Sequence, residues 1–238
     1  MGSPASTQHL SADANSFASL RDEMVKQDIA ARGVRDELVL DAMRKVPREL
    51  FVPENLREFA YEDSPLPIGA GQTISQPYII AFMAEALMLQ GGEKILEIGT
   101  GSGYAAAVLS EIAADVYTIE RLDQLAESAA ARLQELGYRN VHVLHGDGTR
   151  GWPEHAPYDA IVVAAGGPQV PESLKEQLKI GGRLVIPVGA GRRAQELVRV
   201  IRLSDNEYRS QHIADVRFVP LIGEEGWANT SGSTIPEP

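Results

Sequence analysis

From Lys94 onward, short apolar segments alternate with longer mixed segments, and this alternation restricts the possible folds more than any other feature of the chain. The apolar segments predict seven strands, at 94–98, 116–119, 141–144, 159–164, 183–187, 197–203 and 213–219. Segments with helical spacing lie between them, at 104–113, 122–136 and 172–178. Because 159–164 is almost wholly apolar, it is typical of a strand covered on both faces. The pattern favours an α/β fold with a doubly wound, mostly parallel sheet.

The chain before Lys94 predicts a helical extension. Residues 21–60 have apolar positions with helical spacing, interrupted at Pro47 and Pro53. A Pro- and Gly-rich segment leads into an amphipathic helix expected at 78–89. We therefore expect one domain over 21–238, made of a helical, substrate-side region (21–90), a ligand-binding core (91–190) and C-terminal strands (191–238). Residues 1–20 are rich in Ser, Ala and Asn and are expected to be a disordered tail or a non-native remnant.

Composition excludes several classes of function. The chain has no cysteine, which removes disulfides, thiolate metal sites and a cysteine nucleophile. Its formal net charge of -11 argues against a nucleic-acid partner. No apolar run is long enough to cross a membrane, and the N-terminus lacks the features of a secretory signal. We expect a cytoplasmic protein without a membrane partner, and a monomer rather than an oligomer.

The turn after the first predicted core strand is rich in glycine. Gly99, Gly101 and Gly103 follow Glu97 in the order G-x-G-x-G, whereas a dinucleotide fingerprint requires G-x-G-x-x-G. Glycines here permit a tight turn and let the backbone approach a ligand. Such a turn alone fits a simple strand-to-helix connection equally well.

Two acidic residues end the next strands. Glu120 closes the second strand, where a carboxylate can accept hydrogen bonds from ribose hydroxyls. Asp147 follows the third strand within Gly146-Asp147-Gly148, and it suits either an adenine amino group or an ordinary turn. Because the carboxyl ends of parallel strands share one edge, these features converge on one crevice. They favour a nucleoside ligand without phosphates.

These motifs resemble the cofactor site of class I S-adenosylmethionine methyltransferases, with their Rossmann-like sheet, and 178–184 resembles a later K-x-G-G-R-L segment of that group. More narrowly, the chain resembles the protein L-isoaspartate O-methyltransferases over 21–227. The segments that carry the likeness are 34–36, 46–53, 72–77, 146–152 and 217–221. The specific part is Thr73-Ile74-Ser75-Gln76-Pro77. One departure is Ala164-Ala165-Gly166-Gly167-Pro168, where the family more often has an alanine-rich run.

The resemblance implies roles for individual residues. Ser75 would be the active-site serine, although a serine just before Pro77 also suits a helix cap. The implied cofactor residues are Gln76, Pro77, Tyr78, Glu97, Gly99, Thr100, Gly101, Gly103, Glu120, Arg121, Asp147 and Gly148. The implied substrate residues are Thr73, Ile74, Val219, Pro220, Leu221 and Ile222.

The implied reaction is methyl esterification of the free carboxylate of L-isoaspartyl residues, and by extension D-aspartyl residues, in damaged proteins and peptides. S-adenosyl-L-methionine would be the cofactor and S-adenosyl-L-homocysteine the product, and the ester would collapse to a succinimide that starts repair. A carboxylate has an ordinary pKa of about 4 and needs no general base at neutral pH. The five histidines show no metal-ligand spacing, so no metal is expected.

Three other functions are compatible with parts of the sequence. A class I methyltransferase acting on a small molecule or RNA is the main alternative, but 164–168 lacks the Asn/Asp-Pro-Pro-aromatic motif of amino-methylating enzymes. A non-catalytic scaffold of the same fold would be expected to lose Ser75 or the glycine turn, and both are present. A nicotinamide dehydrogenase is disfavoured by the glycine spacing.

Overall fold

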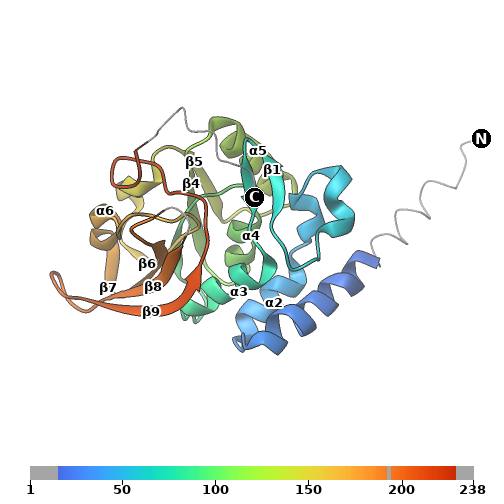
Figure 1. Ribbon diagram of the computed structural model, residues 1–238, viewed down its shortest axis with the longest axis horizontal. Helices are drawn as coiled ribbons and strands as arrows, with labels where there is room; N and C mark the ends of the chain where they lie inside the picture. The colour runs from blue at the N-terminus through green and yellow to red at the C-terminus, as the bar shows by residue number, and fades with distance from the viewer. Residues whose placement is uncertain (1–15, 192–193, 229–238) are drawn as a thin grey trace, which may run out of the picture.

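The centre of the molecule is a seven-stranded sheet (Figure 1). The computed structural model describes residues 16–191 and 194–228. The strands are β3 (Lys94–Ile98), β4 (Asp115–Glu120), β5 (Val141–His145), β6 (Tyr158–Val163), β7 (Leu178–Val188), β8 (Gln195–Arg202) and β9 (Tyr208–Val216). Their order is β5-β4-β3-β6-β7-β8-β9. Neighbours from β5 to β7 run parallel, whereas β8 runs antiparallel to β7 and β9. The mostly parallel, seven-stranded sheet is confirmed.

The central strands are apolar because both of their faces are covered. Ile95 and Leu96 are successive residues of β3, and each has an exposed fraction of 0%. Ile95 packs into the core that includes the N-terminal helices, whereas Leu96 belongs to a second core with Tyr158 and Leu174. Successive side chains of a strand point to opposite faces, so each central strand contributes to both cores. Helices α4 (Tyr104–Ser110), α5 (Asp123–Glu135) and α6 (Glu172–Glu176) connect the strands.

The N-terminal third is a group of short helices, two strands and one longer helix. In chain order they are η1 (Val25–Ile29), η2 (Ala30–Arg32), α2 (Glu37–Lys45), η3 (Arg48–Phe51), η4 (Glu54–Phe59), β1 (Leu66–Gly69), β2 (Gln72–Ile74) and α3 (Pro77–Ala86). Asp36 caps α2, because its carboxylate accepts the amides of Leu38 at 2.9 Å and Val39 at 3.4 Å. Figure 1 shows α2 beside α3 and α4, away from β7–β9. The hairpin β1–β2 was not predicted.

The N-terminal boundary differs from the expectation. Residues 16–24 are helical, so 16–20 are not a disordered tail; residues 1–15 lie outside the described residues. The helix is held by an aromatic contact, because the ring of Phe17 lies 6.2 Å from that of Tyr61. The polar composition of 1–20 gives no sign of this contact, which is why the sequence predicted a tail where residues 16–20 are helical.

Two predicted strand boundaries were also wrong. β7 begins at Leu178, where the sequence predicted the end of a helix, and Gly181-Gly182 form an irregularity in its pairing with β6. A Cβ on Gly182 would lie 2.8 Å from the Lys179 carbonyl oxygen, so the close approach requires glycine. β9 ends at Val216 rather than 219, because its register with β8 ends where Val216 pairs with Gln195.

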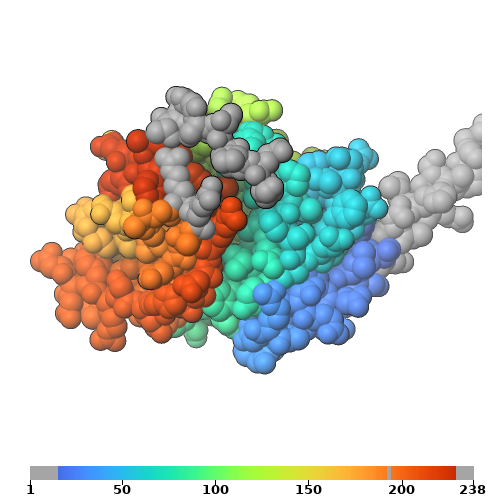
Figure 2. Space-filling model, viewed as in Figure 1, coloured from blue at the N-terminus to red at the C-terminus, as the bar shows by residue number. Residues whose placement is uncertain are grey.

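The strand order creates a crevice above β3. The chain leaves β3 for β4 on one side and returns to β6 on the other, so the connections diverge at the carboxyl end of β3. Ligands of open α/β sheets bind at such a point. In Figure 2 the turquoise-green atoms at the place that Figure 1 labels α3 lie between the blue and cyan N-terminal part and the orange C-terminal part.

Candidate active site

A cavity with an empty volume of about 1110 Å³, including space open to solvent, lies at this edge of the sheet. Three segments far apart in sequence line it: the strand β2 with α3, the glycine turn with the end of β4, and 218–222. It contains most of the predicted site residues, namely Thr73, Ile74, Ser75, Glu97, Gly99, Thr100, Gly101, Glu120, Arg121, Gly148, Val219, Pro220, Leu221 and Ile222. Gln76, Pro77, Tyr78, Gly103 and Asp147 do not line it.

The glycine turn has a backbone that other residues rarely adopt. Gly99, Gly101 and Gly103 have φ angles of 96°, 54° and 89°. Gly103 is the N-cap residue of α4 and lies outside the cavity, where a Cβ would lie 3.1 Å from Leu133 Cδ1. The Gly99 amide donates to the Ile119 carbonyl at 2.8 Å, so the turn is attached to β4.

Glu120 lies at the end of β4 with an exposed fraction of 6%. Its carboxylate accepts the amide of Gly101 at 2.9 Å and that of Leu122 at 3.0 Å. A carboxylate has about four acceptor positions, so two remain for ligand hydroxyls. Glu120 therefore both holds the glycine turn and presents acceptors to the cavity.

Glu97 is the second acidic residue of the cavity, and its exposed fraction is 1%. Its pKa is raised to about 8, mainly because the carboxylate is buried. The hydrogen bond from Thr118 lowers the pKa, and the charge of Glu120 raises it. The Thr118 hydroxyl lies 2.6 Å from the carboxylate and 2.7 Å from the Thr100 hydroxyl. A cation that enters the cavity would favour the ionised form of Glu97.

Asp147 has a role that the sequence did not reveal. One carboxylate oxygen accepts the Thr149 amide at 2.9 Å and the Thr149 hydroxyl at 2.7 Å. The other accepts the Glu224 amide at 2.8 Å. Asp147 thus ties the loop after β5 to the C-terminal segment, while its neighbour Gly148 lines the cavity.

Ser75 lies at the junction between β2 and α3. The N-cap residue of α3 is Gln76, and no side-chain hydrogen bond caps this helix. The helix-cap role that the sequence suggested for Ser75 is therefore absent. Its carbonyl accepts a hydrogen bond of 2.8 Å from Arg48 Nη2. Ser75 therefore lines the cavity, and its backbone is hydrogen-bonded to Arg48, which lies outside the cavity.

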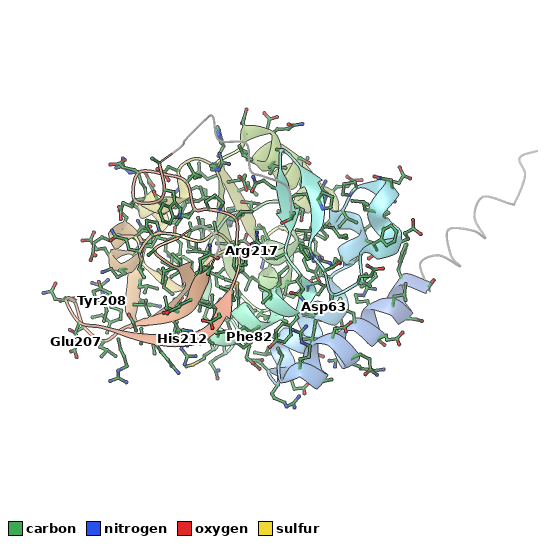
Figure 3. The ribbon with its side chains drawn as sticks, viewed as in Figure 1. Asp63, Phe82, Glu207, Tyr208, His212 and Arg217 are labelled. Carbon is green, nitrogen blue, oxygen red and sulfur yellow. The ribbon has the colours of Figure 1, made fainter. Side chains whose placement is uncertain are left out.

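Gln76 and Tyr78 lie outside the cavity and bind Asp63, which Figure 3 labels. Asp63 accepts the Gln76 side-chain amide at 2.5 Å and the Tyr78 backbone amide at 3.0 Å. It also forms an ion pair with Arg32, whose guanidinium lies 3.6 Å from the centre of the Tyr78 ring. These residues fix the start of α3, and with it the position of Ser75.

Residues 218–222 form the third wall of the cavity. The Gly166 amide donates to the Val219 carbonyl at 2.7 Å, and its carbonyl accepts the Leu221 amide at 2.9 Å. The Trp227 indole donates to the same carbonyl at 2.9 Å. A Cβ on Gly166 would lie 2.8 Å from the Gln195 side chain, so the unusual Gly166-Gly167 pair gives the wall its close packing.

The sequence missed several apolar lining residues, including Ile80, Met83 and Ala84 on α3 and Phe218 before the wall. Their only signal is membership of apolar segments, which does not separate a cavity wall from a core. Within 16–191 and 194–228, no group of three acidic, His or Cys residues is arranged to hold a metal ion.

Comparison with known proteins gives a consistent result. The family model described as protein-L-isoaspartate(D-aspartate) O-methyltransferase matches residues 19–226. Protein-L-isoaspartate O-methyltransferase 1 of Rhodopseudomonas palustris (strain HaA2) is 66% identical over 229 residues, which are 96% of this chain and 92% of that protein. Protein-L-isoaspartate O-methyltransferase 2 of Pelobacter propionicus is 61% identical over 207 residues, 87% of this chain and 92% of that protein.

Solved structures agree in fold. A protein-L-isoaspartate O-methyltransferase structure has a TM-score of 0.78 and 33% identity, and the match covers 87% of this chain and 67% of that one. A candidate protein-L-isoaspartate O-methyltransferase from Plasmodium falciparum, solved with S-adenosyl-L-homocysteine, has a TM-score of 0.72 and 24% identity. That match covers 85% of this chain and 98% of that one.

Proposed function

This chain belongs to the protein-L-isoaspartate(D-aspartate) O-methyltransferase family, and we propose that its cavity carries out the family's reaction. The enzyme transfers a methyl group from S-adenosyl-L-methionine to the free carboxylate of an L-isoaspartyl residue. D-aspartyl residues are the second substrate class. The observation that carries the proposal is that one cavity is lined by Ser75, by the glycine turn with Glu120, and by the wall 218–222.

The residues of the cavity fit the cofactor. Gly99 and Gly101 bring the backbone of the glycine turn into the cavity lining, and Glu120 has acceptor positions free for ribose hydroxyls. Buried Glu97 is an acidic partner for the cofactor's positive charge. Thr100, Arg121 and Gly148 complete this side, and Gly103, Gln76, Pro77, Tyr78 and Asp147 support it from outside. When bound, the cofactor supplies a methyl group already activated on a sulfonium.

The chain's own contribution to the chemistry is positioning. The substrate carboxylate is ionised at neutral pH, so the site needs no general base. We assign to the Ser75 hydroxyl the task of orienting that carboxylate by donating a hydrogen bond. Correct alignment of reacting groups is worth about 7 to 11 kcal/mol in the best intramolecular models.

We assign substrate selection to two segments that line opposite sides of the cavity. Thr73 and Ile74 belong to β2, and Val219 to Ile222 form the opposite wall. An isoaspartyl residue differs from an aspartyl residue by one methylene moved from the side chain into the backbone. A peptide held between these two segments presents its carboxylate to Ser75 only when the backbone path has that extra atom.

The remaining expectations extend this proposal. We assign to the enzyme damaged proteins and peptides as partners, with no nucleic acid or membrane partner, and a monomeric state in the cytoplasm. Its acidic charge of -11 supports the absence of a nucleic-acid partner. Across 16–191 and 194–228, no helix has the length and apolar character needed to cross a membrane.

The test uses labelled S-adenosyl-L-methionine, a peptide with one isoaspartyl residue and its aspartyl twin. The proposal predicts base-labile label in the isoaspartyl peptide alone. Ser75→Ala should lower kcat/KM by about 10- to 100-fold with unchanged cofactor binding, whereas Ser210→Ala, at an exposed position of β9, should match the wild type. Cofactor binding without transfer to either peptide would overturn the assignment and favour a small-molecule or RNA substrate.

A further inference from the structure

Arg48 is a fully buried cation. It lies in η3, has an exposed fraction of 0%, and is among the largest fully buried side chains. No ion pair involves it within the described residues. Its acidic neighbour Glu49 accepts the Tyr61 hydroxyl, and Asp63 pairs with Arg32. Burial lowers the pKa of Arg48, which shows that its charge is costly where it stands.

The contacts of Arg48 join the N-terminal helices to the cavity. Its Nε donates to the Ala60 carbonyl and its Nη2 to the Ser75 carbonyl, each at 2.8 Å. The guanidinium carbon lies 4.8 Å from the centre of the Tyr104 ring. Ser75 and Tyr104 both line the cavity, but Arg48 does not. Arg48 thus lies outside the cavity and contacts two of its lining residues, Ser75 and Tyr104.

The bond to Arg48 is the one hydrogen bond found for Ser75 in the part of the chain that the structure describes. Ser75 follows the last residue of β2 and precedes the first turn of α3, so neither element holds its backbone. The next residue, Gln76, is fixed from the other side by Asp63. Without Arg48 the Ser75 peptide would be free to rotate, and its hydroxyl would lose a defined direction.

We propose that Arg48 is a positioning residue for methyl transfer, which acts by fixing the backbone of Ser75 so that its hydroxyl meets the substrate carboxylate. This inference rests on the role assigned to Ser75 above. A planar guanidinium donates to two buried carbonyls in fixed directions from separate nitrogens, whereas an ammonium places its three donors on one nitrogen and in no fixed plane. The requirement for this geometry explains why a buried charge is kept where an apolar residue would cost less.

The test is a double-mutant cycle of Arg48→Lys and Ser75→Ala. Lysine keeps the charge but places its donors on one nitrogen and in no fixed plane. Arg48→Lys should lower kcat for the isoaspartyl peptide by about 10-fold, with the Kd for S-adenosyl-L-homocysteine within about twofold of the wild-type value. In the Ser75→Ala background, the same change should have an effect below about twofold, because coupled residues are not additive.

Arg183→Lys is the matched control. Arg183 also donates to backbone carbonyls, those of Leu87 at 2.8 Å and Met88 just beyond the end of α3, and that of Gly181 at 3.5 Å. Its substitution should leave kcat unchanged and affect both backgrounds equally.

Three outcomes would overturn the inference. The first is equal loss of kcat from Arg48→Lys in both backgrounds, and the second is a matching loss of S-adenosyl-L-homocysteine affinity. The third is failure of Arg48→Lys to fold, monitored by thermal denaturation, because it indicates a purely structural role. Failure of the role assigned to Ser75 is seen separately, as full activity in the single variant Ser75→Ala, and failure of the proposed function as no transfer by the wild type to either peptide.

Discussion

At the scale of single residues, Glu97 connects burial to cofactor binding. Burial raises its pKa to about 8, above the ordinary value of 4.5, so the empty folded protein holds a proton that the unfolded chain releases. A carboxyl with a raised folded pKa makes stability fall as the pH rises from about 4.5 to about 8, and its contribution levels off above that pH. The same proton must leave if the positively charged cofactor stabilises the ionised form.

We therefore predict that S-adenosyl-L-methionine binding at pH 7 releases a proton in the wild type, but not in Glu97→Gln. Titration calorimetry in buffers of different ionisation enthalpy measures this release. Thermal denaturation should show a flatter decline between pH 5 and 8 for Glu97→Gln than for the wild type. Proton release of equal size in both proteins would show that Glu97 is not the group that releases the proton.

Gly148 shows how closely the cavity floor is packed. A Cβ at this position would lie 2.4 Å from Ile98 Cγ2, although its φ angle is an ordinary one. Gly148→Ala should reduce the free energy of unfolding by about 1 to 3 kcal/mol, the usual cost of overpacking. Denaturant unfolding measures this loss, with Gly191→Ala as control because a Cβ there has no neighbour within 4 Å. A stability equal to that control would mean that Ile98 moves aside freely.

At the scale of elements, the C-terminal segment 217–228 is the part of the cavity with the least regular structure. It is attached through Asp147, which accepts the Glu224 amide at 2.8 Å, and through Thr149, whose hydroxyl accepts the Glu225 amide at 3.1 Å. Asp147→Ala should release the segment, raise the KM for the isoaspartyl peptide and speed proteolysis within 217–228 even without cofactor.

Glu224→Ala is the control for Asp147→Ala. It removes only an exposed ion pair with Arg150 and keeps the backbone amide that Asp147 binds, so its effect should stay within about 1 kcal/mol. If Asp147→Ala instead weakens S-adenosyl-L-homocysteine binding and leaves proteolysis unchanged, the expected adenine contact is its main role.

The same elements show what local sequence can predict. The core strands were predicted within a few residues, because strands buried on both faces leave continuous apolar runs. β9 was displaced because 209–212 are polar and exposed on an edge strand, so their pairing with β8 leaves no apolar signal. Gly181-Gly182 indicated a helix end, yet the same glycines suit an irregular strand pairing, and only the position of β6 decides between them.

At the scale of the whole molecule, the site is built from segments more than a hundred residues apart. Motifs predicted the residues on each side, since the glycine turn, Ser75 and 219–222 all line one cavity. The hydrogen bonds that hold these lining segments in place were not predictable from the sequence. The hydrogen bonds from Arg48 to Ser75 and from Glu224 to Asp147 depend on how the N-terminal helices and the C-terminal segment fold against the sheet.

Because segments from Gln72 to Ile222 line one cavity, a bound ligand should stabilise the domain as a single unit. S-adenosyl-L-homocysteine at 100 times its Kd should add about 2.7 kcal/mol to the free energy of unfolding. At about 2 to 4 °C per kcal/mol for a chain of this size, Tm should rise by about 5 to 11 °C in one calorimetric transition. Limited proteolysis should then show protection in 66–90 and 194–228 together. Two transitions, only one of them shifted by the ligand, would instead divide the chain into separately folding parts.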